Sequence, residues 1–270
     1  MGCTFRFAGY RLPVCYVNEV RRVLYWYLPL LASLSAAAVF AYGFVAWIRG
    51  DLGTVVNLAP VAINGTAPIG KVVPLIVGDS LARGTGDDTG LGIGGRLVED
   101  LRHRGITCER PVNLAVDGAR TNDLLQRLQS HNTLEVAAQS NVIVVSIGGN
   151  DLWGGTDWRN APPKDPEGVM TGVLDRLSQI VAKLRAANPT ARIFIIGLYN
   201  PFISAPQGAM LSPIVTRWNA RLAERFANDI NVAVVPSADL FEWHDRLALD
   251  RFHPSGDGYA LIARRIADTF

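Results

Sequence analysis

Cysteine and net charge are both scarce in this chain of 270 residues. The three cysteines, Cys3, Cys15 and Cys108, are too few and too scattered to form a disulfide framework. The net charge is +2, with 26 basic residues spread among 24 acidic ones. A nucleic-acid-binding surface needs clustered lysine and arginine, so this pattern argues against a nucleic-acid partner. The sequence also has no internal repeat, and its length suits one sizeable globular domain.

One segment lacks charge altogether. Residues 24–47 contain no Asp, Glu, Lys or Arg, and aromatic residues stand at both ends of the run. At about 1.5 Å per residue, a helix of this length spans roughly 36 Å, which is enough to cross a hydrocarbon core of about 30 Å. We therefore expect a transmembrane helix over residues 24–48. A buried core helix is the alternative, although few soluble helices run this long without a charge.

The flanks of this helix predict its orientation. More basic residues precede it than follow it: Arg6, Arg11, Arg21 and Arg22, against Arg49. The more basic flank stays in the cytoplasm, so residues 1–23 are predicted to be cytoplasmic and the C-terminal part periplasmic or extracellular. Cleavage as a signal peptide near residues 36–38 is the alternative. The apolar run continues well past that point, which favours an uncleaved anchor.

Beyond the helix the chain changes character. Residues 49–71 are rich in glycine and proline and are predicted to be a linker. Short apolar runs then predict five strands, at residues 72–77, 111–116, 142–147, 193–198 and 232–235. Stretches with helical spacing follow them, at residues 91–104, 121–138, 166–187, 212–227 and 255–269. The runs are continuous in their apolar character, which is typical of strands buried on both faces. We predict an α/β domain over residues 72–270, with three α/β/α layers around a five-stranded, mainly parallel sheet.

Polar and glycine-rich motifs follow three of these strands. Ser80 comes after the first, Gly118 after the second, and residues 148–151 (GGND) after the third. Residues 250–253 (DRFH) precede the last helix. In parallel α/β sheets, ligands bind at the carboxyl ends of the strands. We therefore expect the four motifs to meet at one edge of the sheet.

The residue types at this edge suit nucleophilic catalysis. Ser80 is the candidate nucleophile, and its hydroxyl needs a base to react at neutral pH. His253 is the candidate base, because an imidazole can take the serine proton and return it to a leaving group. Asp250, three residues earlier, is placed to bond one ring nitrogen and fix the tautomer. Asp239 and Asp245 are alternative acids.

Gly118 and Asn150 are the candidate oxyanion donors, together with the backbone N–H of Ser80. A glycine lets the backbone approach a developing oxyanion closely, and the asparagine amide donates a neutral hydrogen bond. Losing one such donor typically costs about 3–4 kcal/mol of transition-state stabilisation. The Gly-x-Ser-x-Gly elbow of the α/β-hydrolases does not surround Ser80.

The order and placement of these motifs resemble those of the SGNH hydrolases, also called GDSL-type esterases and lipases. The blocks that carry the resemblance are residues 77–81 (VGDSL), 113–119 (NLAVDGA), 147–151 (IGGND) and 250–255 (DRFHPS). The resemblance covers roughly residues 72–270. It implies a flavodoxin-like fold, Ser80, Asp250 and His253 as catalytic residues, and Ser80, Gly118 and Asn150 as the oxyanion hole. It also implies that neither a metal nor an organic cofactor is needed.

The substrate is less constrained by the sequence. Resemblance to bacterial members around residues 80–88, together with a membrane anchor, favours lipid or lysophospholipid esters, and Arg83 is a candidate contact for a phosphate. An esterase that removes O-acetyl groups from envelope polysaccharide is the alternative. A membrane-tethered binding module without activity is a third reading. The sequence does not separate hydrolysis from acyl transfer to another alcohol, and it gives no oligomeric state.

Overall fold

The computed structural model describes residues 4–7, 10–13, 21, 23–48, 61, 63–64, 70–153, 165–203, 208–242 and 244–270. They belong to two compact units, Met1–Asn57 and Leu58–Phe270. Most of the predicted linker and part of the basic flank lie outside the described residues.

The first unit contains an antiparallel hairpin and a long apolar helix. The hairpin pairs β1 (Thr4–Phe7) with β2 (Tyr10–Pro13), and was not predicted from the sequence. A short π-helical segment, η1 (Val23–Tyr27), leads into α2 (Leu28–Ile48). The stretch Val23–Val45 is long and apolar enough to cross a membrane, and none of its most apolar window is buried within the protein. A signal sequence meets the same criteria of length and composition.

The second unit is built on a sheet of five parallel strands. They are β3 (Pro74–Gly78), β4 (Val112–Asn113), β5 (Val142–Ser146), β6 (Arg192–Ile196) and β7 (Val232–Val235). Their order across the sheet is β4-β3-β5-β6-β7. Taken in chain order this is 2-1-3-4-5, the flavodoxin-like arrangement, which reverses direction between β3 and β5. The predicted α/β fold with a five-stranded parallel sheet is confirmed.

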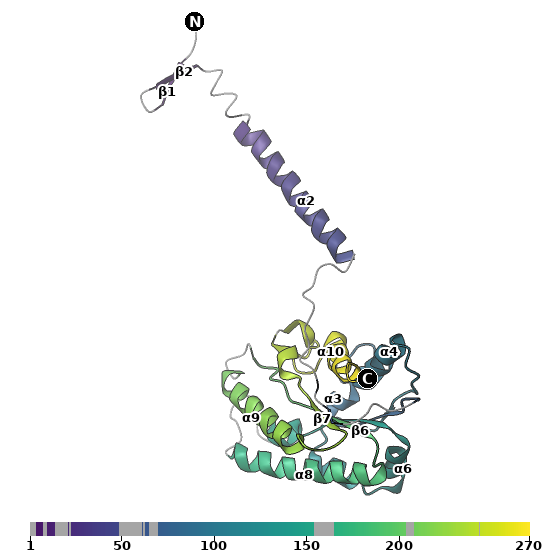
Figure 1. Cartoon of the computed structure of the whole chain (residues 1–270). Helices are drawn as coiled ribbons and strands as arrows, with labels where there is room; N and C mark the ends of the chain where they lie inside the picture. Colours follow the sequence, from purple (N-terminus) through teal and green to yellow (C-terminus); the bar gives the residue numbers. More distant parts are fainter. Residues whose placement is uncertain are drawn as a thin grey trace. The chain divides into compact units, whose positions relative to one another are not determined.

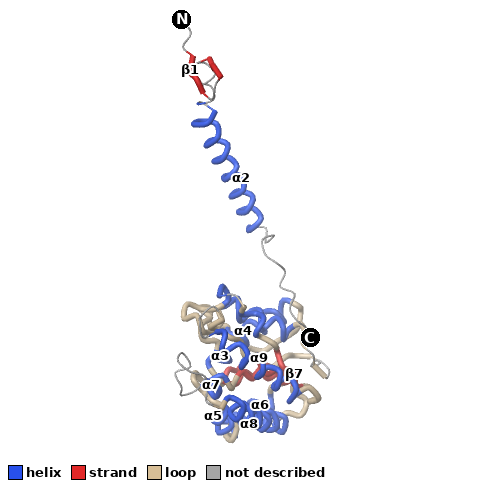
Figure 2. The backbone as a smooth tube through the Cα atoms, turned by 90° about the vertical axis from the view of Figure 1, so that its left-hand side faces the viewer, coloured by secondary structure: helices blue, strands red, loops and turns tan. Residues whose placement is uncertain are grey.

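Helices cover both faces of this sheet, and Figures 1 and 2 show α4 and α8 on opposite sides of the strands. On one face the core includes residues of α5 (Thr121–Arg127), α6 (His131–Gln139), α8 (Pro166–Ala187) and α9 (Gly208–Phe226). On the other it includes residues of α4 (Gly92–His103), α10 (Gly256–Ala267) and the 3₁₀ turn η2 (Ala238–Phe241). A second 3₁₀ turn, η3 (His244–Arg246), follows. Successive side chains of β5 point to opposite faces of the sheet, so this strand contributes to both cores. Ile143 and Val145 pack on the first face, and Val142 and Val144 pack on the second.

Several elements differ from the sequence-based expectation. The single helix expected over residues 121–138 is two helices, α5 and α6, with a turn between them. The edge strand β4 has two residues in regular pairing instead of six. Two short helices at strand ends, α3 (Ser80–Arg83) and α7 (Gly149–Trp153), were not predicted, because four or five residues are too few to show a helical period.

Part of the segment predicted as a linker packs on the domain. Val61 and Ile63 are partly buried against the core that includes α4 and α10. The Asn64 carbonyl accepts a hydrogen bond from the Asn231 N–H at 2.5 Å, and the Asn64 side chain donates to the Ala227 carbonyl at 3.2 Å. Val61, Ile63 and Asn64 of the predicted linker therefore make contacts with the hydrolase domain.

Candidate active site

Ser80 lies at the carboxyl end of β3, where the chain enters α3. The side chain of Asp79 caps this helix, because its Oδ1 accepts a hydrogen bond from the Leu81 N–H at 3.1 Å. Gly84 ends it in the left-handed region, with φ of 95°, which a glycine adopts without strain. The nucleophile candidate is therefore held in the first turn of a capped helix at the switch point of the sheet.

His253 and Asp250 lie in the loop between η3 and α10. The His253 Nε2 is 2.9 Å from the Ser80 Oγ, and its Nδ1 is 2.6 Å from the Asp250 Oδ2. The other oxygen of Asp250 accepts the N–H groups of Phe252 at 2.9 Å and His253 at 3.0 Å. Burial raises the pKa of Asp250, but the hydrogen bonds from the His253 ring and these two N–H groups outweigh it and leave the pKa below its usual value. A carboxylate, an imidazole and a hydroxyl therefore form one hydrogen-bonded chain.

Two tyrosines hold the loops that carry this chain. The Tyr199 hydroxyl donates to the Phe252 carbonyl at 2.6 Å, next to His253. Burial raises the pKa of Tyr199 well above its usual value, so the hydroxyl stays protonated and can donate. The Tyr259 hydroxyl donates to the Thr85 carbonyl at 2.7 Å. The backbone at Gly86 packs so closely on the histidine loop that an added Cβ would lie 2.9 Å from the His253 Cβ.

Asn150 and Gly118 follow the ends of β5 and β4, the two strands that flank β3 in the sheet. Asn150 lies in α7, and its side-chain N–H donates to the Ala119 carbonyl at 3.0 Å. That bond uses one of the two amide protons and fixes the direction of the other. Gly118 has φ of 74°, in the left-handed region. The residue before it, Asp117, accepts a hydrogen bond from the Thr85 hydroxyl at 2.8 Å, and the residue after it, Ala119, accepts the bond from Asn150. Both chain neighbours of Gly118 are therefore held by hydrogen bonds.

A cavity of about 60 Å³ opens beside these groups. Its lining includes the candidate nucleophile, base and amide donor, Ser80, His253 and Asn150, but not Gly118. Much of the remaining wall is apolar or aromatic, from Leu81, Trp153, Leu198, Tyr199, Pro201 and Phe252. The site therefore combines a candidate nucleophile and base with a small, largely apolar space.

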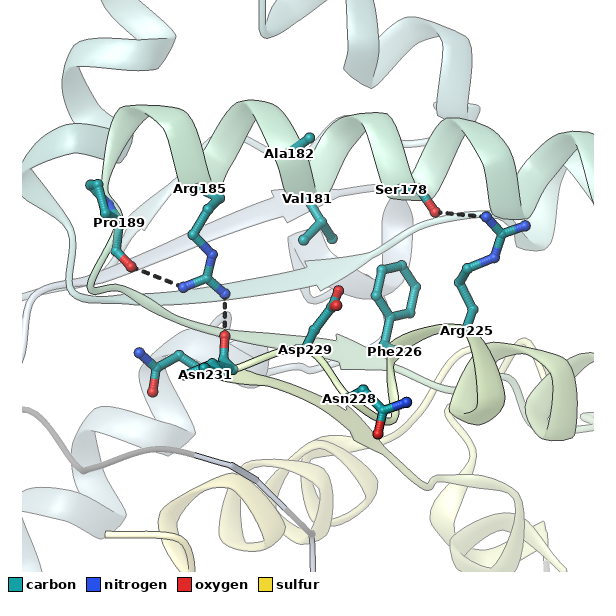
Figure 3. A pocket seen from close by; sticks show the side chains of 11 residues that line it. Ser178, Val181, Ala182, Arg185, Pro189, Arg225, Phe226, Asn228, Asp229 and Asn231 are labelled. Atoms are coloured by element: carbon teal, nitrogen blue, oxygen red, sulfur yellow. Dashed lines mark hydrogen bonds between the residues drawn. The ribbon is translucent and has the colours of Figure 1, made fainter.

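A larger groove of about 770 Å³ lies elsewhere, between α8 and the segment that joins α9 to β7 (Figure 3). Its arginines are already bonded: Arg185 to the carbonyls of Pro189 and Ile230, and Arg225 to Ser178. The Ser178 hydroxyl donates to the Leu174 carbonyl, and the residues that line the groove include no histidine. Volume alone therefore does not identify the reactive site.

Comparison with known proteins identifies the family. A model of the GDSL-like lipase/acylhydrolase family matches residues 76–261, well over half of the chain. The chain belongs to this family. It is a GDSL-family carboxylic ester hydrolase, of the SGNH type that the sequence motifs resemble.

Three individual proteins similar to this chain have sequence identities between 20% and 28%. The protein YpmR of Bacillus subtilis (strain 168) is 28% identical over 203 residues, covering 72% of this chain and 80% of that protein. The lipase Lip_vut3 from a goat rumen metagenome has a similar structure, with a TM-score of 0.64 and 20% identity over 73% of this chain and 97% of that one. The acetylxylan esterase Axe2 from Geobacillus stearothermophilus gives a TM-score of 0.54 and 22% identity, over 75% and 96% of the two chains. At these identities the structures share the fold.

The sequence-predicted residues of this GDSL-family hydrolase fall into two groups. Ser80, His253 and Asp250 are joined by hydrogen bonds, and Asn150 lines the same cavity. The alternative acid Asp239 is instead bound by Arg265, one of whose contacts is 2.7 Å. Arg83 is exposed and paired with Asp117 at 3.2 Å, so its predicted role in substrate binding stays a prediction.

Two residues of the site were not singled out by the sequence. Tyr199 gave no local signal, because its hydrogen bond joins positions 53 residues apart. Asp79 entered the sequence analysis only within the block of residues 77–81, although its position before a short helix is a capping signal. It is buried, with 6% of its surface exposed.

Asp79 is an acid in an unfavourable place for a charge. Burial raises its pKa from 3.8 to about 7, against the lowering effect of the N–H groups of Leu81 and Ala82, and Asp151 adds a small repulsion. The neutral acid is therefore the form that the fold favours. Because the folded pKa lies above the unfolded one, its contribution to stability is complete below pH 3.8 and is lost as the pH rises to about 7.

Replacing Asp79 with asparagine should reduce the stability that the protein loses as the pH rises. Asp79→Asn keeps an oxygen that can accept the Leu81 N–H but carries no charge at any pH. Each pH unit in the window is worth up to about 1.4 kcal/mol, so we expect the variant to gain stability over the wild type by a few kcal/mol between pH 5 and pH 8. Thermal unfolding of the full chain in mild detergent at both pH values measures this. An equal difference between the two proteins at pH 5 and pH 8 would show that Asp79 does not titrate in this range.

Proposed function

We propose that Ser80, His253 and Asp250 hydrolyse carboxylic esters through an acyl-enzyme. The observation that carries this proposal is the pair of contacts at His253, 2.9 Å to the Ser80 Oγ and 2.6 Å to the Asp250 Oδ2. Both distances are within hydrogen-bond reach, so one imidazole can accept a proton from the serine while the aspartate fixes its tautomer.

The reaction proceeds in two steps. As the Ser80 Oγ attacks the ester carbonyl carbon, His253 Nε2 takes the hydroxyl proton and the carbonyl π electrons move onto oxygen. The tetrahedral intermediate then expels the alcohol, which leaves with the proton from His253, and an acyl group stays on Ser80. Water repeats the sequence on the acyl-enzyme and releases the acid, with free Ser80 regenerated.

The oxyanion formed in each step needs hydrogen-bond donors. We propose the backbone N–H groups of Ser80 and Gly118 and the Asn150 amide. The Ala119–Asn150 bond supports this role, because it uses one amide proton of Asn150, leaves the other without a partner among the described residues, and fixes the amide on the cavity that Ser80 also lines. Donors fixed before the reaction stabilise the charge without a cost of reorganisation.

The size of the cavity bears on the acyl group. Pockets that enclose drug-sized ligands measure about 300–1,000 Å³, whereas the apolar space beside Ser80 measures about 60 Å³. That space supports a short acyl group such as acetyl, and so favours the O-acetyl esterase over the lysophospholipid esterase that the sequence suggests first. A long acyl chain would have to lie outside this cavity.

The apolar helix bears on where the enzyme works. We propose that Val23–Val45 anchors the protein in a membrane, with the hydrolase domain on the periplasmic or extracellular side. The length and composition of the helix and the excess of arginine before it support this topology. The substrate would then be an ester within reach of the membrane surface, and an envelope polysaccharide carrying O-acetyl groups fits that position and the small cavity.

Removing the nucleophile or the base should abolish turnover. We expect Ser80→Ala and His253→Ala each to lower kcat for a chromogenic acetate ester by at least about 10⁴-fold, because either change removes the step that forms the acyl-enzyme. Ser178→Ala is the matched control, since that hydroxyl is bonded to a helix carbonyl and to Arg225 in the distant groove. Near-wild-type turnover by folded Ser80→Ala protein would refute the proposal.

A chain-length series should show the limit set by the cavity. With p-nitrophenyl esters from acetate to palmitate, we expect kcat/KM to be highest for two to four carbons and to fall at least tenfold by eight carbons. Leu198→Ala shortens a side chain in the cavity wall and should shift the acyl-chain length with the highest kcat/KM toward longer chains. A maximum at eight carbons or more in the wild type would instead support the lipid-ester substrate.

A further inference from the structure

A partly buried polar network lies behind the proposed oxyanion hole and takes no direct part in the reaction. Arg176 of α8 donates from Nε to the Thr121 hydroxyl at 2.5 Å and from Nη2 to the Asp151 Oδ1 at 3.0 Å. The Thr121 hydroxyl and N–H donate to the two oxygens of Asp151 at 2.6 and 2.9 Å. Three residues from three helices therefore form a closed ring of four hydrogen bonds.

The network adjoins both proposed donors. Asp151 directly follows Asn150, and Thr121 lies three residues after Gly118. A further bond, from the Asn150 amide to the Ala119 carbonyl, joins the same two segments, and Asn150 lines the cavity together with Ser80. Two sets of hydrogen bonds therefore connect the segment of Gly118 to the segment of Asn150: Asn150 to Ala119, and Thr121 to Asp151. Arg176 donates a hydrogen bond to each segment.

We infer that Arg176 is a positioning residue for ester hydrolysis. Through Thr121 and Asp151 it holds the Gly118 N–H and the Asn150 amide at the separation that a tetrahedral oxyanion needs. This inference rests on the proposed function, because it assigns Arg176 to the oxyanion hole of that reaction.

Burial and charge explain why an arginine is needed here. The Thr121 side chain is fully buried and the Asp151 side chain is 6% exposed, so neither can exchange its partners for water. An uncompensated carboxylate at this depth would be costly, and the guanidinium supplies both the charge and two directed donors. The backbone of Gly172, one turn earlier on α8, leaves room for the Arg176 Nη1, which would lie 3.2 Å from a Cβ at that position.

The helix that carries Arg176 is a suitable support. α8 is the longest helix described in the hydrolase domain, at 22 residues, and seven of them are buried in the core. Catalytic groups must be held within about 0.5 Å of their productive positions, and side chains on such helices hold them better than loops do. The short segments around Gly118 and Asn150 gain that rigidity by bonding to α8.

A purely structural role of Arg176 and a positioning role lead to different expected effects on stability and turnover. If Arg176 only fixed α8 to its neighbours, its loss would lower stability and leave the turnover of the folded enzyme unchanged. If it aligns the oxyanion donors, its loss lowers kcat while KM changes little, because the donors act chiefly in the transition state.

The first test uses the full chain in mild detergent with p-nitrophenyl acetate. We expect Arg176→Ala to lower kcat by roughly 10- to 100-fold, less than the loss of a whole donor costs, with KM within about twofold of the wild type. Arg176→Lys keeps the charge but cannot bond Thr121 and Asp151 in the same two-pronged way, so its kcat should lie between those of the wild type and Arg176→Ala. Arg225→Ala is the matched control: it removes an arginine bonded to Asp175 and Ser178 of the same helix, and its kcat should match the wild type.

A double-mutant cycle identifies the path of the effect. In an Asn150→Ala background, Arg176→Ala should cost less than about threefold in kcat, because a donor that it aligns is already gone. A boronic acid that forms a tetrahedral adduct on Ser80 gives a second readout. Its inhibition constant should rise across the variants in proportion to the fall in kcat/KM.

Other outcomes would overturn the inference. Wild-type kcat in folded Arg176→Ala protein would do so, as would a full, additive loss in the Asn150→Ala background. If Arg176→Ala does not fold, Thr121→Val carries the same test: it should lose clearly more kcat than Thr121→Ser, which keeps the hydroxyl, and equal values would contradict the inference. Turnover by Ser80→Ala would overturn the proposed function itself, so the two failures are distinguishable.

Discussion

The close approach of β3 and β5 at their carboxyl ends is the constraint on which the site depends. Gly78 has φ of 140°, and an added Cβ there would overlap the carbonyl oxygen of Ser146. In the next residue, the Asp79 N–H donates to that same oxygen at 2.9 Å. The chain therefore turns from strand into α3 at a fixed point, and Ser80 appears beside the segment that follows β5. Ser80 and Asn150 line the same cavity because β3 and β5 are adjacent in the sheet.

This arrangement places an acid where water cannot solvate it. Asp79 caps the helix of the nucleophile, yet burial raises its pKa to about 7, and the nearby charge that acts on it, Asp151, is also negative. Asp250 is in the opposite situation, with its pKa lowered by bonds from the His253 ring and two N–H groups. Two carboxyl groups near one serine thus ionise in different pH ranges, because one is desolvated and the other is held by hydrogen bonds. In the proposed reaction, the ionised Asp250 stabilises the imidazolium of His253.

The elements that could be predicted from the sequence are those whose signal is local. The strand at 232–235 and the helix at 166–187 have the predicted bounds. For the helix the reason is visible: Asp165 caps the Gly168 N–H at 2.9 Å, Pro166 begins the first turn, and Asn188-Pro189 follows the end. The order of the motifs likewise predicted a common sheet edge, because parallel strands bring their carboxyl ends together.

What could not be predicted depends on contacts between distant residues. The turn between α5 and α6, and the helices α3 and α7, are too short to show a period. Tyr199 holds the histidine loop across 53 positions, and Arg176 reaches Thr121 across 55. Each is an ordinary residue in its own segment, and only the fold gives it a partner. The candidate triad could be proposed from the sequence because its residue types are chemically distinctive, whereas the residues that support it are not.

The central claim is that Ser80 is the residue that carries the acyl group. The most direct measurement is labelling of the full chain with a fluorophosphonate, followed by mass spectrometry of the digested protein. The account predicts one phosphonylated residue, Ser80, and loss of esterase activity in proportion to its labelling. Labelling of a different residue, or full inactivation with Ser80 unmodified, would contradict it.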